Sequence, residues 1–323
     1  MVYKGMGSIQ MITKTEQVIN QVKKVIIGKD EIAKKVFMTI LAGGHVLLED
    51  IPGVGKTTLA LAFSKVMGLD FNRIQFTPDV IASDVVGFTM YDKNKEEFVF
   101  KQGAVMCNLL LADEINRTTS RTQSALLEVM EEKNVTVDGT TYTLPKPFHV
   151  IATQNPIGSY GTQMLPQSQL DRFMLKTSIG YPDFASQVEI LKDRQTTQPL
   201  DEAKAVISRE ELIEMQHEVS HIHVAEEILT YITSLTVATR EHPLIIQGVS
   251  PRGALALSRI AKAHAYIEGR DYVIPEDVME MFVDTCNHRI VLEQKAQVSK
   301  NGPSTILNDI MNEIKSPDNR IHV

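Results

Sequence analysis

The segment from Leu47 to Thr58 joins an apolar stretch, a glycine-rich turn and the dipeptide Lys56-Thr57. A turn of this kind between a strand and a helix lets successive backbone amides surround phosphate oxygens, and the helix N-terminus adds positive potential. Lys56 would reach the β- and γ-phosphates of a nucleotide, and the Thr57 hydroxyl would ligate magnesium. The usual pattern has glycine where this chain has Asp50, so the alternative is a strand-turn-helix with a chance Gly-Lys-Thr. The sequence predicts a phosphate-binding loop.

Two adjacent acids, Asp113 and Glu114, follow the apolar run 109–112. Successive strand residues point to opposite sides, so the two carboxylates can do different jobs. We expect Asp113 to hold magnesium, mostly through water. Glu114 is the candidate general base for an attacking water. Such a pair often has only a structural role, but its position about 57 residues after Lys56 makes the combination more specific.

Three further polar positions could act on the same nucleotide. Asn155 ends the apolar run 148–153 and could hold an amide between the γ-phosphate and the water; a turn-forming Asn-Pro is the alternative. Arg172 begins a later apolar run, where a structural salt bridge is the alternative. Arg252 lies in the first turn of a predicted helix, where a cation opposes the helix dipole. That unfavourable placement indicates an anionic partner such as a phosphate.

Strands and helices alternate through the first part of the chain. Apolar strands are predicted at 45–49, 71–76, 106–112, 148–153 and 173–179, and helices at 15–25, 30–41, 56–66 and 120–131. This order predicts an α/β fold with a five-stranded, mostly parallel sheet sandwiched by helices. Segments 77–105 and 133–147 interrupt the order and are predicted insertions. The second has Asp138-Gly139 between alternating β-formers, which predicts a hairpin.

After residue 182 the predicted strands stop, and a small all-α domain is expected. Its helices are predicted at 184–194, 209–220, 225–240, 251–268, 276–288 and 303–314. Ser208 with Glu211 forms a capping box, and Ser250 before Pro251 is a helix N-cap. The predicted organisation is therefore a flexible N-terminus at 1–12, an α/β domain at 13–182 and a helical domain at 183–323.

The composition is that of a globular protein, with 43% apolar and 23% charged residues among 323. It excludes a mainly disordered chain, and no apolar run is long enough for a membrane span. The first ten residues lack a signal-peptide core, and two distant cysteines form neither a disulfide framework nor a zinc pattern, so a cytoplasmic location is expected. The net charge of −7 disfavours a nucleic-acid partner.

These motifs, in this order, resemble those of the AAA+ ATPases and, within them, the MoxR family. The resemblance covers the chain from about residue 11 to residue 291. It rests on Leu48-Glu-Asp-Ile-Pro-Gly-Val-Gly-Lys-Thr57, Arg73-Ile-Gln-Phe-Thr-Pro-Asp-Val80 with Ser83-Asp-Val-Val-Gly87, Asp113-Glu-Ile-Asn-Arg117, Thr153-Gln-Asn-Pro156 and Leu170-Asp-Arg-Phe173. The two insertions fall where this clade carries its helix-two insert and its hairpin before the first sensor strand.

The resemblance implies an AAA+ P-loop domain followed by a helical lid, with ATP and Mg²⁺ as ligands. The implied metal ligands are Thr57 and Asp113. Asn155 matches the first sensor, and Arg172 matches the arginine finger that reaches a neighbouring subunit's nucleotide. Arg252 matches the second sensor, acting on its own subunit or on a neighbour.

The resemblance also implies a set of nucleotide-binding residues. These are Ile27 and Gly28 at the adenine, with Pro52, Gly53, Val54, Gly55, Lys56, Thr57, Thr58 and Asp113 at the phosphates and metal. Lys56, Glu114, Asn155, Arg172 and Arg252 are the implied catalytic residues. Gly253 stands where alanine is expected.

The function that this resemblance implies is chaperone-like. A homo-oligomer, taken as a hexameric ring, would hydrolyse ATP to remodel or activate client proteins, or to assist their maturation and metal loading. The implied client or adaptor carries a von Willebrand factor A domain.

Three other functions stay open from the sequence. A helicase-like motor on DNA is disfavoured by the negative charge, and a slow nucleotide switch is disfavoured by the intact Glu114, Asn155 and Arg172. A small-molecule kinase would need an acceptor pocket that the sequence does not indicate. His217, His221 and His223 could be read as a metal site, but a solvated helix end is favoured.

Overall fold

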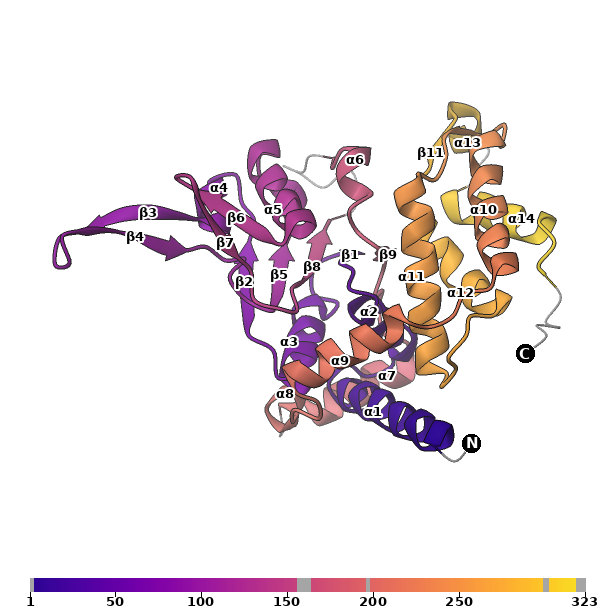
Figure 1. Ribbon diagram of the computed structural model, residues 1–323, viewed down its shortest axis with the longest axis horizontal. Helices are drawn as coiled ribbons and strands as arrows, with labels where there is room; N and C mark the ends of the chain where they lie inside the picture. The colour runs from indigo at the N-terminus through magenta and orange to yellow at the C-terminus, as the bar shows by residue number, and fades with distance from the viewer. Residues whose placement is uncertain (1–2, 156–163, 196–197, 299–301, 318–323) are drawn as a thin grey trace.

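Five parallel strands form the central sheet of the protein, in a computed structural model that describes residues 3–155, 164–195, 198–298 and 302–317 (Figure 1). Their spatial order is β2-β5-β8-β1-β9, and each neighbouring pair is parallel. The strands are β1 Val46–Glu49, β2 Phe71–Gln75, β5 Leu109–Asp113, β8 His149–Gln154 and β9 Leu175–Thr177. Each overlaps a predicted strand, so the predicted five-stranded sheet is confirmed.

The register of the strands brings their carboxyl ends to one edge of the sheet. Glu49 at the end of β1 pairs with Gln154 of β8, and Gln75 of β2 pairs with Asp113 of β5. We call this the carboxyl edge and the opposite one the amino edge. Polar residues that end or follow β1, β5 and β8 therefore lie near one another, whereas residues that precede β9 lie at the amino edge.

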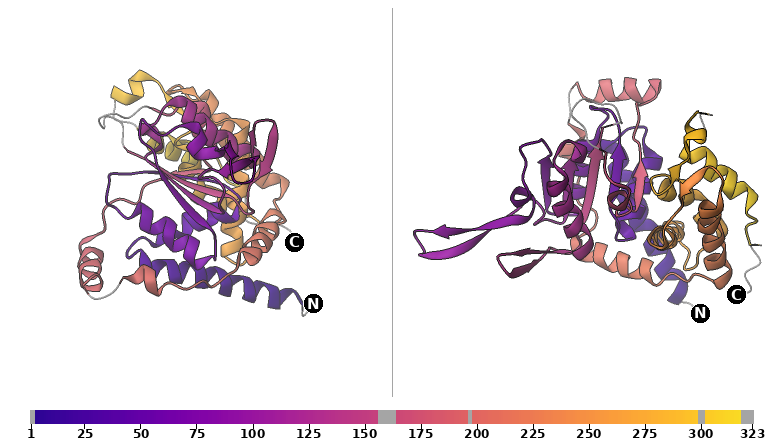
Figure 2. Two further views of the ribbon diagram at one scale, coloured as in Figure 1. Left: turned by 90° about the vertical axis from the view of Figure 1, so that its left-hand side faces the viewer. Right: turned by 90° about the horizontal axis from the view of Figure 1, so that it is seen from above.

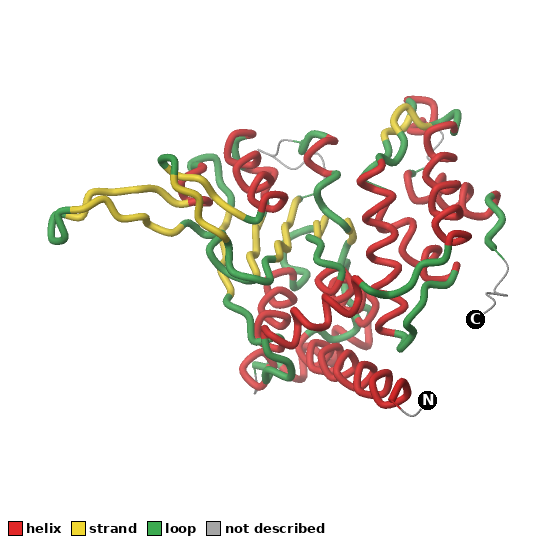
Figure 3. The backbone as a smooth tube through the Cα atoms, viewed as in Figure 1, coloured by secondary structure: helices red, strands yellow, loops and turns green. Residues whose placement is uncertain are grey.

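Alternate strand residues pack into two apolar cores, one on each face of the sheet. Leu48, Leu109 and Leu111 belong to one core, and Leu47 and Leu110 to the other. The helices around the first core include α1 Tyr3–Val25, α2 Asp30–Leu41 and α3 Lys56–Val66, and those around the second are α4 Ala82–Val86 and α5 Ser120–Glu132 (Figure 3). Each fully buried leucine contributes about 1.5–3 kcal/mol. This two-sided burial explains why the strands read as continuous apolar runs.

The first helix begins at Tyr3, well before the predicted start at residue 15. The prediction followed the apolar periodicity, which begins near residue 15. A formed helix, however, extends by one hydrogen bond for each added residue without needing an apolar face. The flexibility expected of residues 1–12 stays a prediction.

Both insertions contain antiparallel hairpins that leave the sheet on the side of β2 (Figure 2). The predicted one is β6 Asn134–Val137 with β7 Thr140–Thr143. The other, β3 Gly87–Asp92 with β4 Glu97–Gln102, is longer and lies within the insertion at 77–105. The rings of Phe100 and Tyr142 stack at 4.0 Å between centroids and join the two hairpins.

The helical region after β9 falls into two groups (Figure 1). The first group lies near α1–α3 and comprises α7 Phe184–Asp193, α8 Pro199–Glu202 and α9 Arg209–Ser220. The second flanks β9 and comprises α10 Glu226–Glu241, α11 Pro251–Ile267, α12 Pro275–Cys286, α13 Gln294–Val298 and α14 Pro303–Glu313. The short helix α6, Gln167–Leu170, precedes β9.

One detail of the predicted all-α region is wrong. β10 Ile245–Gln247 and β11 Val291–Leu292 form a small antiparallel pair that joins the ends of α10 and α12. Both lie in apolar runs of three residues, 244–246 and 290–292, which are too short to show the periodicity of a strand.

Candidate functional site

The phosphate loop follows β1 at the carboxyl edge and has the backbone that an anion needs. Gly53 and Gly55 adopt φ values of +87° and +99°, which favour glycine, and a Cβ built on either meets no described atom within 4 Å. Among the described residues no side chain caps the N-terminus of α3. This cradle fits a phosphate.

Asp50, which replaces the usual glycine, has a structural task that the sequence did not reveal. Its carboxylate accepts hydrogen bonds from the Ser178 hydroxyl at 3.0 Å and from the backbone amides of Ile179 and of Gly180, the last at 3.2 Å. The acid therefore ties the start of the phosphate loop to the segment after β9. Its only sequence signal was the departure from the motif.

Lys56 lies against the loop with its ammonium group held in place. Its Nζ donates to the carbonyl oxygen of Asp50 at 2.8 Å, and the side chain is buried. Burial lowers the pKa of this lysine, and the nearby Asp113 and Asp50 carboxylates oppose that shift. Lys56, Thr57, Asp113 and Glu114 are among the residues that line one cavity of about 390 Å³. The structure thus brings together the predicted phosphate and metal ligands.

Asp113 ends β5 in a dense set of polar contacts. Its Oδ1 accepts from the Thr153 hydroxyl at 2.6 Å, and its Oδ2 lies 2.7 Å from the Arg73 guanidinium. Thr153 also accepts the Glu114 amide at 2.8 Å, which links the ends of β5 and β8. Carboxylate and hydroxyl oxygens are donors that magnesium prefers, so Asp113 and Thr57 fit the predicted metal.

Glu114 is turned by a strained backbone rather than by strand alternation. β5 ends at Asp113, and Glu114 adopts φ +56°, which non-glycine residues seldom do. Its carboxylate accepts from Gln75 at 2.9 Å, Arg117 at 2.7 Å and Asn155 at 3.0 Å. Burial raises the pKa of this acid, but the bonds from Arg117 and Asn155 outweigh it and hold the pKa below its usual range. The group is therefore ionised and able to accept a proton.

The side-chain amide of Asn155 uses its nitrogen in a hydrogen bond, whereas its oxygen has no partner among the described residues. Its Nδ2 donates to Glu114. Asn116 fixes the backbone of Asn155: its Oδ1 accepts from the Asn155 backbone amide at 3.3 Å, and its Nδ2 donates to the Asn155 carbonyl at 3.2 Å. The Asn155 Oδ1 is buried with no hydrogen-bond partner in the described part of the chain. A buried unpaired acceptor calls for a partner such as a bound water. The following residue of the motif, Pro156, lies outside the described residues.

The two predicted adenine residues have different positions. Ile27 lines a cavity of about 350 Å³, together with Val54 and Tyr181, and that cavity shares Gly53 and Gly55 with the phosphate site. Gly28 is instead a point of close backbone approach. It has φ +72°, and a Cβ there would lie 2.1 Å from the Ser186 hydroxyl of α7.

Arg172 and Arg252 lie away from this site, at the amino edge. Both pair with Glu131 near the end of α5: Arg172 at 3.0 Å from Oε2, and Arg252 with Oε1. β9, the edge strand that Arg172 precedes, is the direct neighbour of β1, so Arg172 and the phosphate loop are not separated across the sheet. The separation runs along the strands instead, since Arg172 precedes β9 whereas the loop follows β1.

The histidines considered as a metal site lie at the end of α9. The His217 and His221 rings are 4.3 Å apart, and His221 Nδ1 lies 2.8 Å from the His217 carbonyl. Within the ranges that the structure describes, no group of three or more His, Cys, Asp or Glu residues could hold a metal ion. Thr57 and Asp113 stay the candidate metal ligands of the chain.

The sheet order, the loop after β1, the acids that end β5 and the amide after β8 define an ATPase of the AAA class. A family model described as the ATPase family associated with various cellular activities matches residues 45–175, and one for the AAA lid domain matches residues 237–310. Within this class the chain belongs to the MoxR family, and it is a nucleotide-binding ATP hydrolase. AAA proteins generally assemble into oligomeric rings.

Individual relatives cover nearly the whole chain. The chain is 44% identical to protein YeaC of Bacillus subtilis over 94% of both chains. It is 39% identical to chaperone MoxR1 of Mycobacterium tuberculosis, over 94% of this chain and 82% of that one. A crystal structure of a candidate ATPase from Cytophaga hutchinsonii superposes with a TM-score of 0.89 at 38% identity, over 96% of this chain and 97% of the other. No helix in the described ranges has the length and apolar character needed to cross a bilayer.

Proposed function

We propose that this protein hydrolyses ATP at sites shared between neighbouring copies and uses the turnover to remodel client proteins. One observation carries the proposal: Arg172 and Arg252 converge on Glu131 at the amino edge, while the phosphate loop lies at the carboxyl edge. Packing one copy's amino edge on the next copy's carboxyl edge would deliver both arginines to a nucleotide. Heterologous packing of this kind forms a ring when the rotation between copies closes, and we propose a closed ring of six copies.

Each residue of the shared site then has a separate task. The loop 52–55 and Lys56 bind the phosphates, and Ile27 contacts the adenine. Thr57 and Asp113 hold magnesium, which neutralises phosphate charge when bound. Glu114 accepts a proton from the attacking water, and Asn155 orients that water. The neighbour's arginines offset charge that develops on the transferred phosphoryl group.

The exposed apolar residues of the β3–β4 hairpin are an argument for a protein client. Phe98 is 75% exposed near the turn of the hairpin, where its ring contacts that of Tyr91, and Phe88 is exposed on the opposite face. An apolar group of this kind on a projecting arm marks a protein contact. A relative named as a chaperone agrees with this use. We propose a client or adaptor with a von Willebrand factor A domain, whose maturation or metal loading depends on the ATPase.

Mixing two inactive variants tests the shared site. Lys56→Ala lacks triphosphate binding but keeps its arginines, and Arg172→Ala lacks the arginine but keeps its loop. In a mixed assembly some sites pair an intact loop with an intact arginine, so ATPase should recover. The matched control is the double variant Lys56→Ala/Arg172→Ala, which cannot restore either partner. Mixed assemblies that form by mass measurement but stay inactive would contradict the proposal.

A separate experiment tests the client. A Glu114→Gln variant held with ATP should retain its client for affinity capture, because hydrolysis is blocked. Recovery of a protein with a von Willebrand factor A domain supports the proposal. Recovery of nucleic acid, with stimulation of the ATPase by DNA, would favour the helicase-like motor instead.

A further inference from the structure

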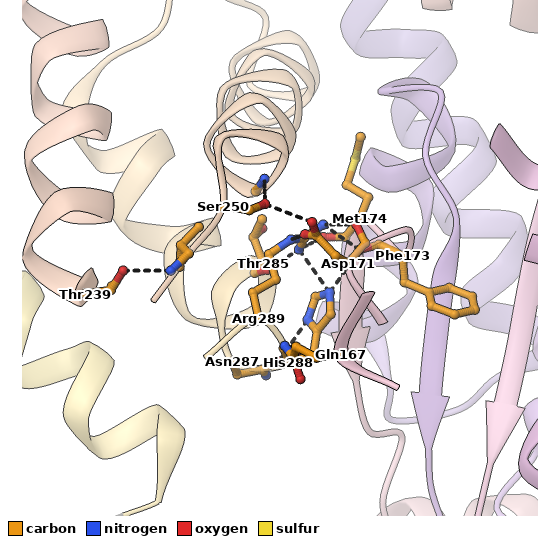
Figure 4. Close-up of polar contacts among 12 residues, drawn as sticks. Gln167, Asp171, Phe173, Met174, Thr239, Ser250, Thr285, Asn287, His288 and Arg289 are labelled. Carbon is orange, nitrogen blue, oxygen red and sulfur yellow. Dashed lines mark hydrogen bonds and ion pairs between the residues drawn. The ribbon is translucent and has the colours of Figure 1, made fainter. Parts of the chain in front are cut away.

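Arg289, in the turn after α12, binds the chain segment that carries Arg172 (Figure 4). It is only 3% exposed. Its Nε donates to Asp171 Oδ1 at 2.7 Å, and its Nη2 donates to the carbonyls of Phe173 at 2.7 Å and Asp171 at 3.2 Å. Its Nη1 donates to the Met174 carbonyl at 3.2 Å. One buried guanidinium therefore fixes the backbone on both sides of Arg172.

The other oxygen of Asp171 binds the segment that carries Arg252. The Ser250 hydroxyl donates to Asp171 Oδ2 at 2.8 Å and, as the N-cap of α11, accepts from the Gly253 amide at 3.1 Å. Arg252 lies in this first turn, two residues after Ser250. A single carboxylate thus joins the two segments that hold the arginines, with α11 and α12 on one side and the strand β9 on the other.

Further contacts from the same turn support this joint. The His288 ring bonds through Nε2 to the Phe173 carbonyl at 2.9 Å, and the Asn287 amide donates to the Lys176 carbonyl at 3.3 Å. The missing side chain at Gly253 belongs to this packing as well. A Cβ there would lie 2.7 Å from Cδ of Arg289, so glycine leaves room for the arginine to pass.

This packing places the side chains of Arg172 and Arg252 next to one another, at the same acid. Arg172 and Arg252 reach different oxygens of one Glu131 carboxylate. Two guanidinium groups set to bind two oxygens of one anion are also set for two oxygens of a phosphate. Glu131 therefore shows the spacing that the joint imposes on the two arginines.

We propose that Asp171, Ser250 and Arg289 are positioning residues that hold Arg172 and Arg252 as one unit, so that both act together on a neighbour's nucleotide. The inference rests on the shared site proposed above. It further implies that movement of α11 and α12 relative to the sheet displaces both arginines together, and so couples the helical region to hydrolysis.

Asp171→Asn tests the unit, because the amide keeps the size of the side chain but loses the charge and one acceptor. A displacement of about 1 Å at a catalytic group costs up to ~100-fold in rate. We expect kcat to fall roughly 10- to 100-fold, with the KM for ATP changed less than about twofold. Mixing with Lys56→Ala should restore activity, since that partner supplies an intact arginine unit. A purely structural defect of the variant would not be relieved in this way.

Ser250→Ala provides a second test that does not disturb a buried charge. It removes the bond to Asp171 and one helix cap. The matched control is Ser208→Ala, since Ser208 caps α9 with the same bond to the third helical residue, Glu211, at 3.2 Å. We expect Ser250→Ala to lower kcat several-fold and Ser208→Ala to leave it unchanged at equal thermal stability.

The outcomes separate this inference from the shared site itself. If Arg172→Ala mixed with Lys56→Ala also stays inactive, the shared site fails and the unit fails with it. If that pair recovers but Asp171→Asn with Lys56→Ala does not, the positioning role is overturned. Wild-type kcat in Asp171→Asn, or equal effects of Ser250→Ala and Ser208→Ala, would overturn it too.

Discussion

The two edges of the sheet are built in different ways. At the carboxyl edge, Lys56, Asp113 and Asn155 each follow or end a strand and meet because parallel strands end together. At the amino edge, Glu131, Arg172 and Arg252 come from an α-helix, a turn and a distant helix, and long-range bonds hold them. The nucleotide pocket is therefore a local product of the sheet, whereas the arginine pair depends on how the helical region docks. We therefore expect changes at the two edges to have different effects.

The largest expected effect is the fall in the rate of hydrolysis when Arg172, a cation at the amino edge, is removed. Arg172→Ala should lower kcat by roughly 10³–10⁵ while ATP affinity stays near the wild-type value, because the arginine acts on charge that develops in the transition state. Steady-state ATPase and equilibrium nucleotide binding check this. The matched control is Arg209→Ala, an exposed arginine whose ion-pair partner within the described ranges is its neighbour Glu210. Lost ATP affinity in Arg172→Ala would remove the distinction between the edges.

The next effect concerns the base at the carboxyl edge. Glu114→Gln should lower hydrolysis by roughly 10²–10⁴ and leave ATP bound, since it removes a proton acceptor and no phosphate contact. Assemblies should live longer in ATP, as measured by size-exclusion chromatography. Glu128→Gln, on the exposed side of α5, is the control and should behave as wild type. Loss of nucleotide binding would mean that Glu114 is a structural residue.

Acid should destabilise the fold through two histidines that are buried at the amino edge. Burial lowers the pKa of His45 to about 3 and of His149 to about 4, so both stay neutral when folded. In the unfolded chain a histidine binds a proton below its ordinary pKa of 6.5. The unfolding free energy that these histidines contribute is therefore full above that pH and is lost as the pH falls toward their pKa values in the folded protein. For each of the two histidines, the unfolding free energy should fall by about 1.4 kcal/mol for every pH unit of acidification between roughly pH 6 and pH 4.

Denaturant titrations at several pH values measure this slope. His149→Gln should reduce it, and the exposed control His221→Gln should not. The His45 ring lies 3.1 Å from the carbonyl oxygen of Met130. Met130 precedes Glu131, the acid that pairs with both arginines, so the acid-sensitive histidine lies next to the arginine pair. An unchanged slope in His149→Gln would show that these histidines are not linked to folding.

The smallest effect on stability is expected at the short hairpin. Replacing Thr136–Thr143 with a Gly-Ser linker keeps the buried Val135 and Leu144, and removes the stack of Tyr142 on Phe100, worth about 1 kcal/mol. Basal ATPase should stay within about twofold while client work is impaired. Tyr142→Ala alone should reproduce the stability loss. A protein that no longer folds would place the hairpin in the core.

The carboxyl edge could be predicted from the sequence because its motifs are local. A glycine-rich turn after a strand and acids at the end of another fix the positions of Lys56 and Asp113 once the strands are parallel. The left-handed turn at Glu114 could not be predicted, because nothing in its residue type demands it. At the amino edge, the sequence indicates Arg172 only through its place in a family motif. Its neighbour Asp171 binds Arg289, 118 positions away, and such a pairing leaves no periodic signal in one sequence.

ATPase per subunit measured against protein concentration, with the mass of the assembly recorded in the same samples, tests the shared site most directly. If Arg172 completes a neighbour's site, as proposed, kcat per subunit should rise steeply as copies associate and fall toward the level of Arg172→Ala on dilution. The concentration midpoint should coincide with that of assembly. Wild-type turnover by a sample shown to be monomeric would contradict the account and return Arg172 to a structural role with Glu131.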